Sequence, residues 1–184
     1  MRLQNQQYTV TTSVETKPFL TLFDFVYNLN NTNTDDYYMA RVFYVTSGDG
    51  NLTSIAFVDL VCAEYEPHAV LEKDQLTFIL FDYIVRLDLA TGSIVSTRNC
   101  DNSGGLLEIY PIEDGYIIHG ECDIFRFDYK LNQVWRFTGR DILVSAEKDR
   151  HFWIKDQTIH CRDFSGWHYV LNLDGVLIHE FQES

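Results

Sequence analysis

Apolar and β-branched residues alternate with polar residues in short stretches along the chain, the pattern of half-buried β-strands. In the first third of the chain, the expected strands are Tyr8–Val14, Phe19–Leu29, Tyr37–Val45 and Leu52–Val61. The turn residues Ser47-Gly48-Asp49-Gly50-Asn51 predict a hairpin between the last two. Polar Asn28–Asp36 predicts a loop. Pro67–Lys73 favours a helical turn, with irregular backbone as the alternative.

The rest of the chain repeats one template, a pair of aspartates 14 residues apart around an apolar hairpin. Its three copies are Asp74 with Asp88, Asp114 with Asp128, and Asp149 with Asp163. Successive copies are 40 and 35 residues apart. A period of this length accommodates about four short strands, the size of a propeller blade.

The second aspartate of each pair is expected to open a turn and to accept its backbone N–H bonds. These turn residues are Asp88, Asp128 and Asp163. Gly92 and Asn132 each lie four residues after their aspartate, so both are expected to adopt positive φ. Clustered on one rim, the three carboxylates would suit Ca²⁺, but local turn bonding explains each of them.

Val85–Val95 resembles the blade repeat of PQQ-like β-propellers, which reads roughly apolar-x-x-Leu-Asp-x-x-Thr-Gly-x-apolar-apolar. Phe125–Trp135 matches in part, while His160–Leu171 lacks the Thr-Gly, and Leu173-Asp174-Gly175-Val176 is the alternative hairpin there. The resemblance, shared in architecture with WD40-like blades, covers residues 74–180. It implies four-stranded blades but no cofactor site, because the family's basic residue and Trp are missing at Ser93 and Ser96.

We therefore expect an all-β fold of blade-like four-stranded antiparallel repeats forming a small or partial β-propeller, with a β-sandwich as the alternative. Residues 1–184 are expected to form a single domain, with a diverged β region at 1–70 and three repeats at 71–184. Tyr37–Leu60 is a candidate fourth unit. An open arc of blades has bare sheet edges, so the first 36 residues, ring closure or a homodimer would have to cover them.

Composition and charge narrow the possible partners. The 184 residues are 46% hydrophobic and 15% aromatic, which excludes a disordered chain. No apolar run reaches the roughly 18 residues of a membrane helix, and the polar start predicts a cytoplasmic protein. With 14 basic and 27 acidic residues, the net charge is −13. This charge disfavours nucleic acid and anionic membranes and would attract a basic protein, unless it serves solubility alone.

Cysteine and histidine are the candidate metal ligands. The four cysteines, Cys62, Cys100, Cys122 and Cys161, are widely spaced and expected to be free, buried thiols. His119-Gly120-Glu121-Cys122 and His160-Cys161 offer soft ligands, but neighbours in a strand point to opposite faces. Zinc needs about four converging ligands, so no metal and no cofactor is expected.

Three tryptophans complete the candidates for binding. Trp135 and Trp153 lie in apolar stretches and are expected in the core. Trp167 lies in Phe164-Ser165-Gly166-Trp167-His168, an expected loop, so Trp167 and His168 are the predicted binding residues.

No phosphate loop, nucleophile elbow or HExxH motif is present. We therefore expect a non-catalytic protein-interaction module, and in a sharper version an acidic intracellular inhibitor or immunity-type protein. The alternative is a small-ligand binding protein or enzyme with a pocket at the repeat axis holding His119 or Asp123.

Overall fold

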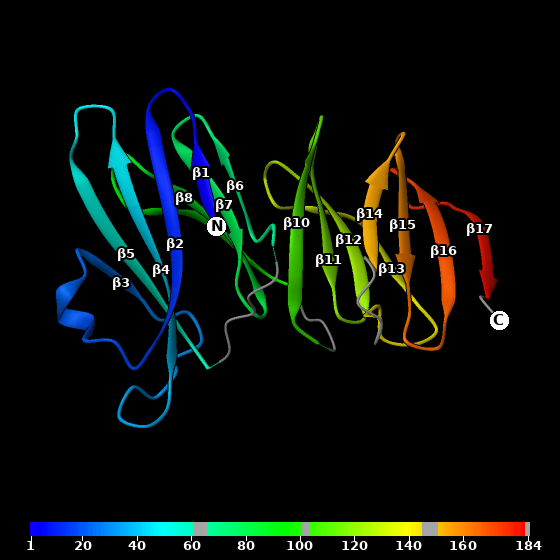
Figure 1. Cartoon of the computed structure of the whole chain (residues 1–184), viewed down its shortest axis with the longest axis horizontal. Helices are drawn as coiled ribbons and strands as arrows, with labels where there is room; N and C mark the ends of the chain where they lie inside the picture. The colour runs from blue at the N-terminus through cyan, green and yellow to red at the C-terminus, as the bar shows by residue number, and fades with distance from the viewer. Residues whose placement is uncertain (61–65, 101–103, 145–150, 183–184) are drawn as a thin grey trace. The chain divides into compact units, whose positions relative to one another are not determined.

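The computed structural model describes residues 1–60, 66–100, 104–144 and 151–182, and β-strands dominate it (Figure 1). The strands form one five-stranded and three four-stranded sheets, which confirms the all-β class. The chain divides into two compact units. The first comprises residues 1–100 with 107–109, and the second comprises residues 101–106 with 110–184.

The first sheet has the order β1-β2-β4-β5-β3. These strands are β1 (Arg2–Gln4), β2 (Tyr8–Thr16), β3 (Phe25–Tyr27), β4 (Met39–Ser47) and β5 (Leu52–Asp59). β4 and β5 form the expected hairpin, closed by the Gly50 N–H donating to the Ser47 carbonyl at 2.9 Å.

Two expectations for this region are wrong in detail. Phe19–Leu29 is not one strand, because only the 3-10 helix η1 (Leu20–Leu22) and the short β3 form within it. β3 then joins the sheet in parallel beside β5. Tyr37–Leu60 does not form a four-stranded unit either, because its two strands pair with N-terminal strands in the five-stranded sheet.

The second sheet is a four-stranded meander of β6 (Ala69–Glu72), β7 (Gln75–Ile79), β8 (Tyr83–Asp88) and β9 (Ile94–Asn99). The expected helical turn at Pro67–Lys73 is therefore a strand, because β6 pairs with β7 across a tight turn in which Lys73 has φ 54°. The first two sheets share one core, in which the Phe78 ring lies 4.5 Å from that of Phe43 and 4.7 Å from that of Phe57.

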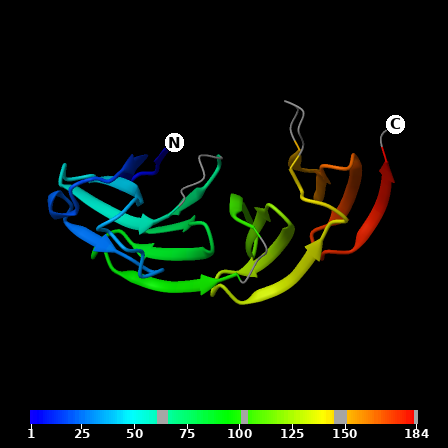
Figure 2. The same cartoon turned by 90° about the horizontal axis from the view of Figure 1, so that it is seen from below.

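Two further meanders of the same order follow along the chain (Figure 1 and Figure 2). The third sheet comprises β10 (Leu106–Ile112), β11 (Gly115–Gly120), β12 (Asp123–Asp128) and β13 (Gln133–Thr138). The fourth comprises β14 (Phe152–Lys155), β15 (Thr158–Arg162), β16 (Trp167–Asn172) and β17 (Leu177–Gln182). A core that includes Ile117, Ile124, Phe152 and Leu171 joins them.

The repeat register is correct for two sheets and wrong for the last. Asp88 and Asp128 both end the third strand of their sheets. In the fourth sheet that place belongs to Asn172, whereas Asp163 lies between the second and third strands. Asn172 serves the turn as an aspartate would, because its Oδ1 accepts the N–H bonds of Asp174 and Val176. Asp149, the other aspartate of that pair, lies outside the described residues.

The expected positive φ is found at Gly92, which has φ 70°, but not at Asn132. Leu131, one residue earlier, has φ 62° instead. The reason is loop length. The Asp88 N–H donates to the carbonyl of Ser93, five residues on, whereas the Asp128 N–H donates to that of Asn132, four residues on. The shorter loop places its left-handed residue one position earlier, and burial of the Leu131 side chain holds it there.

Candidate functional site

The turn aspartates bond locally. Asp88 Oδ1 accepts the backbone N–H and the hydroxyl of Thr91 at 2.8 and 2.9 Å. Asp128 accepts from Lys130 and Asn132, and the hydrogen bonds from Asn132 lower the pKa of its carboxyl. These bonds support a structural role for both residues.

Asp163 also bonds within its own sheet. Its carboxylate accepts the Trp167 N–H at 2.8 Å and the Tyr169 hydroxyl at 2.7 Å. Burial and this hydrogen bond to Asp163 raise the pKa of Tyr169 to about 12. Asp163 therefore stabilises the start of β16 and does not serve as a ligand-binding residue.

Trp167 and His168 begin strand β16 rather than lying in a loop. Trp167 is half-buried and packs against the core, and the guanidinium of Arg140 lies 4.0 Å above its ring. His168 is buried beside the rings of Trp153 and Phe181. The expected exposed pair is therefore mostly occupied by contacts within the unit.

The other two tryptophans, expected in the core, are half-buried. Trp135 packs against the core of the second unit, and its indole N–H donates to the Leu173 carbonyl at 2.9 Å. The Trp153 ring stacks on His160, with centroids 5.0 Å apart.

The described thiols and the carboxylate that could react are buried, half-buried or paired within the fold. Cys100 and Cys161 are buried, and Cys122 is half-buried; Cys62 lies outside the described residues. Burial raises the pKa of the Cys161 thiol, which makes it unreactive. The buried Asp123 carboxylate accepts two hydrogen bonds from Arg136, at 2.8 and 2.6 Å, and so forms an ion pair within the fold.

A hollow of about 530 Å³ opens in the first unit where the loop after β3 meets the end of β5. We call it the acidic hollow. Its carboxylates are Asp36, Asp59 and Asp82, its amides are Asn30, Asn31 and Asn33, its hydroxyl is Thr32, and its apolar members are Tyr37, Leu60 and Phe81. Acidic and apolar walls together suit a ligand with a cationic head and an apolar stem.

Asp59 is the unusual member of the acidic hollow, because its side chain is only 3% exposed. Its Oδ1 accepts the Leu60 N–H at 2.7 Å and the Asn30 amide at 3.3 Å. Its Oδ2 has no hydrogen-bond partner among the described residues. A buried carboxylate oxygen without a donor is costly, so a donor from outside the chain would stabilise this residue.

Sequence reasoning missed the acidic hollow. Asp59 ends a strand, Asp82 lies in the turn before β8, and the amides come from Asn28–Asp36. The sequence predicts the polar loop, but nothing in its composition indicates which strand end the loop covers.

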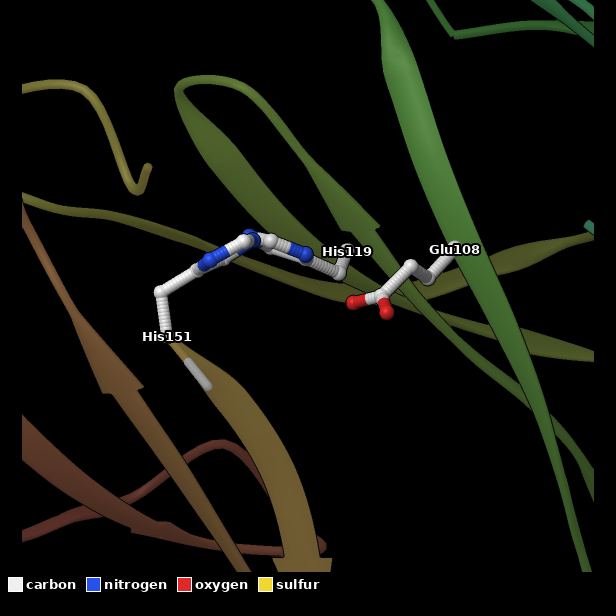
Figure 3. A group of neighbouring side chains, drawn as sticks. All are labelled: Glu108, His119 and His151. Carbon is white, nitrogen blue, oxygen red and sulfur yellow. The ribbon is translucent and has the colours of Figure 1, made fainter. Parts of the chain in front are cut away.

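Two histidines of the second unit, His119 and His151, lie side by side (Figure 3). His119 lies on β11, and His151 directly precedes β14. Their ring centroids are 5.4 Å apart. The sequence indicates His119 as a candidate ligand but not His151, because sequence spacing gives no contact between separate strands.

His119 is fully buried and tightly held. Its Nε2 lies 2.9 Å from the Leu143 carbonyl oxygen, and the Phe152 ring stacks on the imidazole with centroids 4.5 Å apart. Figure 3 shows the His151 ring approaching that of His119.

Comparison with known proteins bears on the fold alone. No family model and no curated protein matches the chain. The computationally designed Ika8 protein is similar, with TM-score 0.50, 10% identity, 76% of this chain and 46% of that chain covered. The designed Ika4 protein has TM-score 0.50 and 10% identity, with 68% of this chain and 80% of that chain covered. The Pan2 WD40 domain of Neurospora crassa has TM-score 0.49 and 9% identity, with 63% of this chain and 37% of that chain covered.

The chain thus spans less than half the length of Ika8 and of the Pan2 domain. Within its described residues, no helix is long and apolar enough to cross a membrane. The three consecutive meanders and the likeness to the two designed proteins confirm an all-β architecture of propeller-type blades.

Proposed function

We propose that the chain is a non-catalytic protein-interaction module that binds a basic segment of another protein in the acidic hollow. The observation that carries this proposal is the buried Oδ2 of Asp59, which has no hydrogen-bond donor among the described residues. An acidic inhibitor of a basic protein, of the immunity type, is the sharper form of the same function.

An Arg or Lys side chain from the partner supplies what the acidic hollow needs. Its N–H groups would donate to Asp59, forming the short, charge-assisted bonds typical of such pairs. Its aliphatic stem would lie against Leu60 and Phe81, and the ring of Tyr37 would favour the adjacent positive charge. The net charge of −13 would speed the encounter.

The burial and internal pairing of the other candidate groups support binding over catalysis. Asp123 is paired with Arg136, and the Cys161 thiol is buried. Neither has the exposed, activated setting that a nucleophile or general base needs. The acidic hollow would also admit a small organic cation, so the experiment must separate the two kinds of ligand.

The test is affinity capture from the source cell with three baits. They are the wild type, the hollow variant Asp59→Asn with Asp82→Asn, and a control, Glu113→Gln with Asp156→Asn. Both variants lose two negative charges, but the control changes exposed positions of the second unit. We expect one basic protein on the wild-type and control baits and at least tenfold less of it on the hollow variant.

Equal retention of that protein on all three baits would contradict the proposal. Arginine amide, added as a competitor, distinguishes the ligand classes. If it binds the wild type at micromolar concentration while no protein is retained, the chain is a small-cation binder instead.

A further inference from the structure

We propose that one face of the fourth sheet is a docking surface for an acidic segment of a partner protein. We call it the histidine face and define it by Trp153, His160, Arg162, His168, His179 and Phe181. The proposal goes beyond the recognition of a basic segment, because the face lies in the second unit and contains none of the residues of the acidic hollow.

Strand register places these side chains on one side of the sheet. Residues paired directly across neighbouring strands point to the same side. Trp153 pairs with His160. His168 pairs with Arg162 on one flank and with Phe181 on the other. His160 and Arg162 are two positions apart on β15, so the two sets of pairs share one side.

The opposite side of the sheet packs into the core, whereas the histidine face is partly open. Ile159, Cys161 and Leu171 alternate with residues of the face and are fully buried. On the face itself, Phe181 is 38% exposed and His179 is exposed. This side of the sheet therefore offers a surface to a partner.

The rings of the histidine face contact one another in a row that crosses all four strands. The Trp153 centroid lies 5.0 Å from that of His160 and 5.3 Å from that of His168. The Phe181 centroid lies 4.7 Å from that of His168 and 5.4 Å from that of His179. A partner would meet a continuous surface of rings, and aromatic residues are frequent anchors of protein interfaces.

Charge indicates the kind of partner. The strand residues on this side of the fourth sheet include no Asp or Glu, although the net charge of the chain is −13. Lys155 and Arg162 carry permanent positive charge there, and the Arg162 guanidinium lies 5.9 Å from the centroid of the Trp153 ring. Glu180 lies on the other side, where it pairs with Arg140. Carboxylates of a partner would therefore meet cations and imidazoles.

The histidines make this recognition dependent on pH. The ionisable groups at the face are Lys155 of β14, Asp156 of the following turn, His160 and Arg162 of β15, His168 of β16 and His179 of β17. Histidine gains its charge near pH 6.5, and burial, together with the charge of Lys155, lowers the pKa of His160. Partner carboxylates are still ionised at pH 6. Falling pH therefore adds positive charge to the face and should tighten binding.

Other occupants fit the histidine face less well. A second copy docked through the same face would bring Arg162 and Lys155 against their own counterparts. Nucleic acid carries one negative charge per about 1.7 Å of duplex, so the −13 charge of the chain would oppose it strongly. A segment with a few carboxylates among apolar residues is repelled less and complements both the cations and the rings.

The test is fluorescence anisotropy of a labelled random copolymer of glutamate and tyrosine, titrated with the full chain at physiological salt. Titrations at pH 8 and pH 6 are compared. We expect saturable binding that is about fivefold tighter at pH 6, because the histidines gain charge over this range.

Two lysine variants form a matched pair. Lys155→Gln and Lys130→Gln each remove one exposed lysine of the second unit, but Lys130 lies in the turn before β13, outside the face. Affinity should fall about threefold in Lys155→Gln and stay unchanged in Lys130→Gln. His179→Gln should bind like the wild type at pH 8 and gain less affinity at pH 6. Circular dichroism and melting establish that these variants, all at exposed positions, are folded.

Four results would overturn the proposal. They are no saturable binding at either pH, equal losses in the two lysine variants, an affinity that does not rise at pH 6, or tighter binding of a single-stranded oligonucleotide than of the copolymer. The last result would assign the face to nucleic acid. Sedimentation of the chain alone tests the remaining occupant, because a dimer that is lost in Phe181→Ala would assign the face to a second copy and contradict the proposal.

Discussion

Asp59 and Asp82 line the same acidic hollow, and burial, together with the charge of Asp59, raises the pKa of the Asp82 carboxyl. A carboxyl group whose ionisation is disfavoured by burial and by a neighbouring negative charge is stabilised by an added positive charge. This relationship links the fold of the first unit to the proposed recognition of a basic segment.

The raised pKa of Asp82 predicts a pH-dependent stability. The unfolded carboxyl releases its proton near pH 3.8, before the folded one does, so rising pH lowers the free energy of unfolding from there through the folded pKa. Asp82→Asn removes this loss. We therefore expect the variant to be more stable than the wild type at pH 7 and equally stable below pH 3.8. Urea unfolding over this pH range measures the gap, and a gap that does not change with pH would contradict the assignment.

Gly92 is required by its turn. Its φ is 70°, and a Cβ there would lie 2.5 Å from the Phe25 ring. Gly92→Ala is therefore expected to cost about 2 kcal/mol or more, from backbone strain and crowding combined. Gly48→Ala is the control, because its Cβ would meet only the Gln7 carbonyl oxygen, at 3.5 Å. Chemical denaturation of both variants tests this, and equal losses would argue against the turn assignment.

Two arginines of the second unit should differ in their contribution to stability. Arg136 pairs with Asp123, whose side chain is 1% exposed, whereas Arg140 pairs with the more accessible Glu180. Removing the partner of a buried charge typically costs about 3–5 kcal/mol, while surface pairs contribute about 1 kcal/mol or less. Because Arg136 is itself partly exposed, we expect about 3 kcal/mol for Arg136→Met. Arg140→Met, which also loses its contact with Trp167, should cost about 1 kcal/mol. Similar losses in urea unfolding would refute this ranking.

The sequence predicted the blades well where local chemistry decides the structure. Alternation and the Asp-x-x-Thr-Gly turn located β8, the turn at Gly92 and the strand that ends at Asp128. Asn and Asp can serve such a turn equally well, so the prediction based on the aspartate is wrong there. Asn172 performs the role assigned to Asp163. Leu131 adopts the left-handed conformation assigned to Asn132, because loop length and burial outweigh local preference.

The residues that come together at the sites could not be predicted from the sequence pattern. Asp59 and Asp82 come together because a polar loop covers the end of β5, and His119 of β11 meets His151, which lies 32 residues later in the chain. Both are contacts between distant parts of the chain, which periodicity and spacing do not encode. Trp167 was singled out for its type and its neighbours, but strand formation half-buried it.

The most direct test of the proposed function is the association rate constant of the captured partner, measured over a salt series. The wild type and the charge-matched control, Glu113→Gln with Asp156→Asn, are compared with Asp59→Asn. Long-range attraction by the −13 charge should slow association steeply with salt in all three proteins. The loss of one buried acceptor should instead speed dissociation at least tenfold in Asp59→Asn alone. A salt-independent association rate, or an unchanged dissociation rate in Asp59→Asn, would contradict recognition of a basic segment in the acidic hollow.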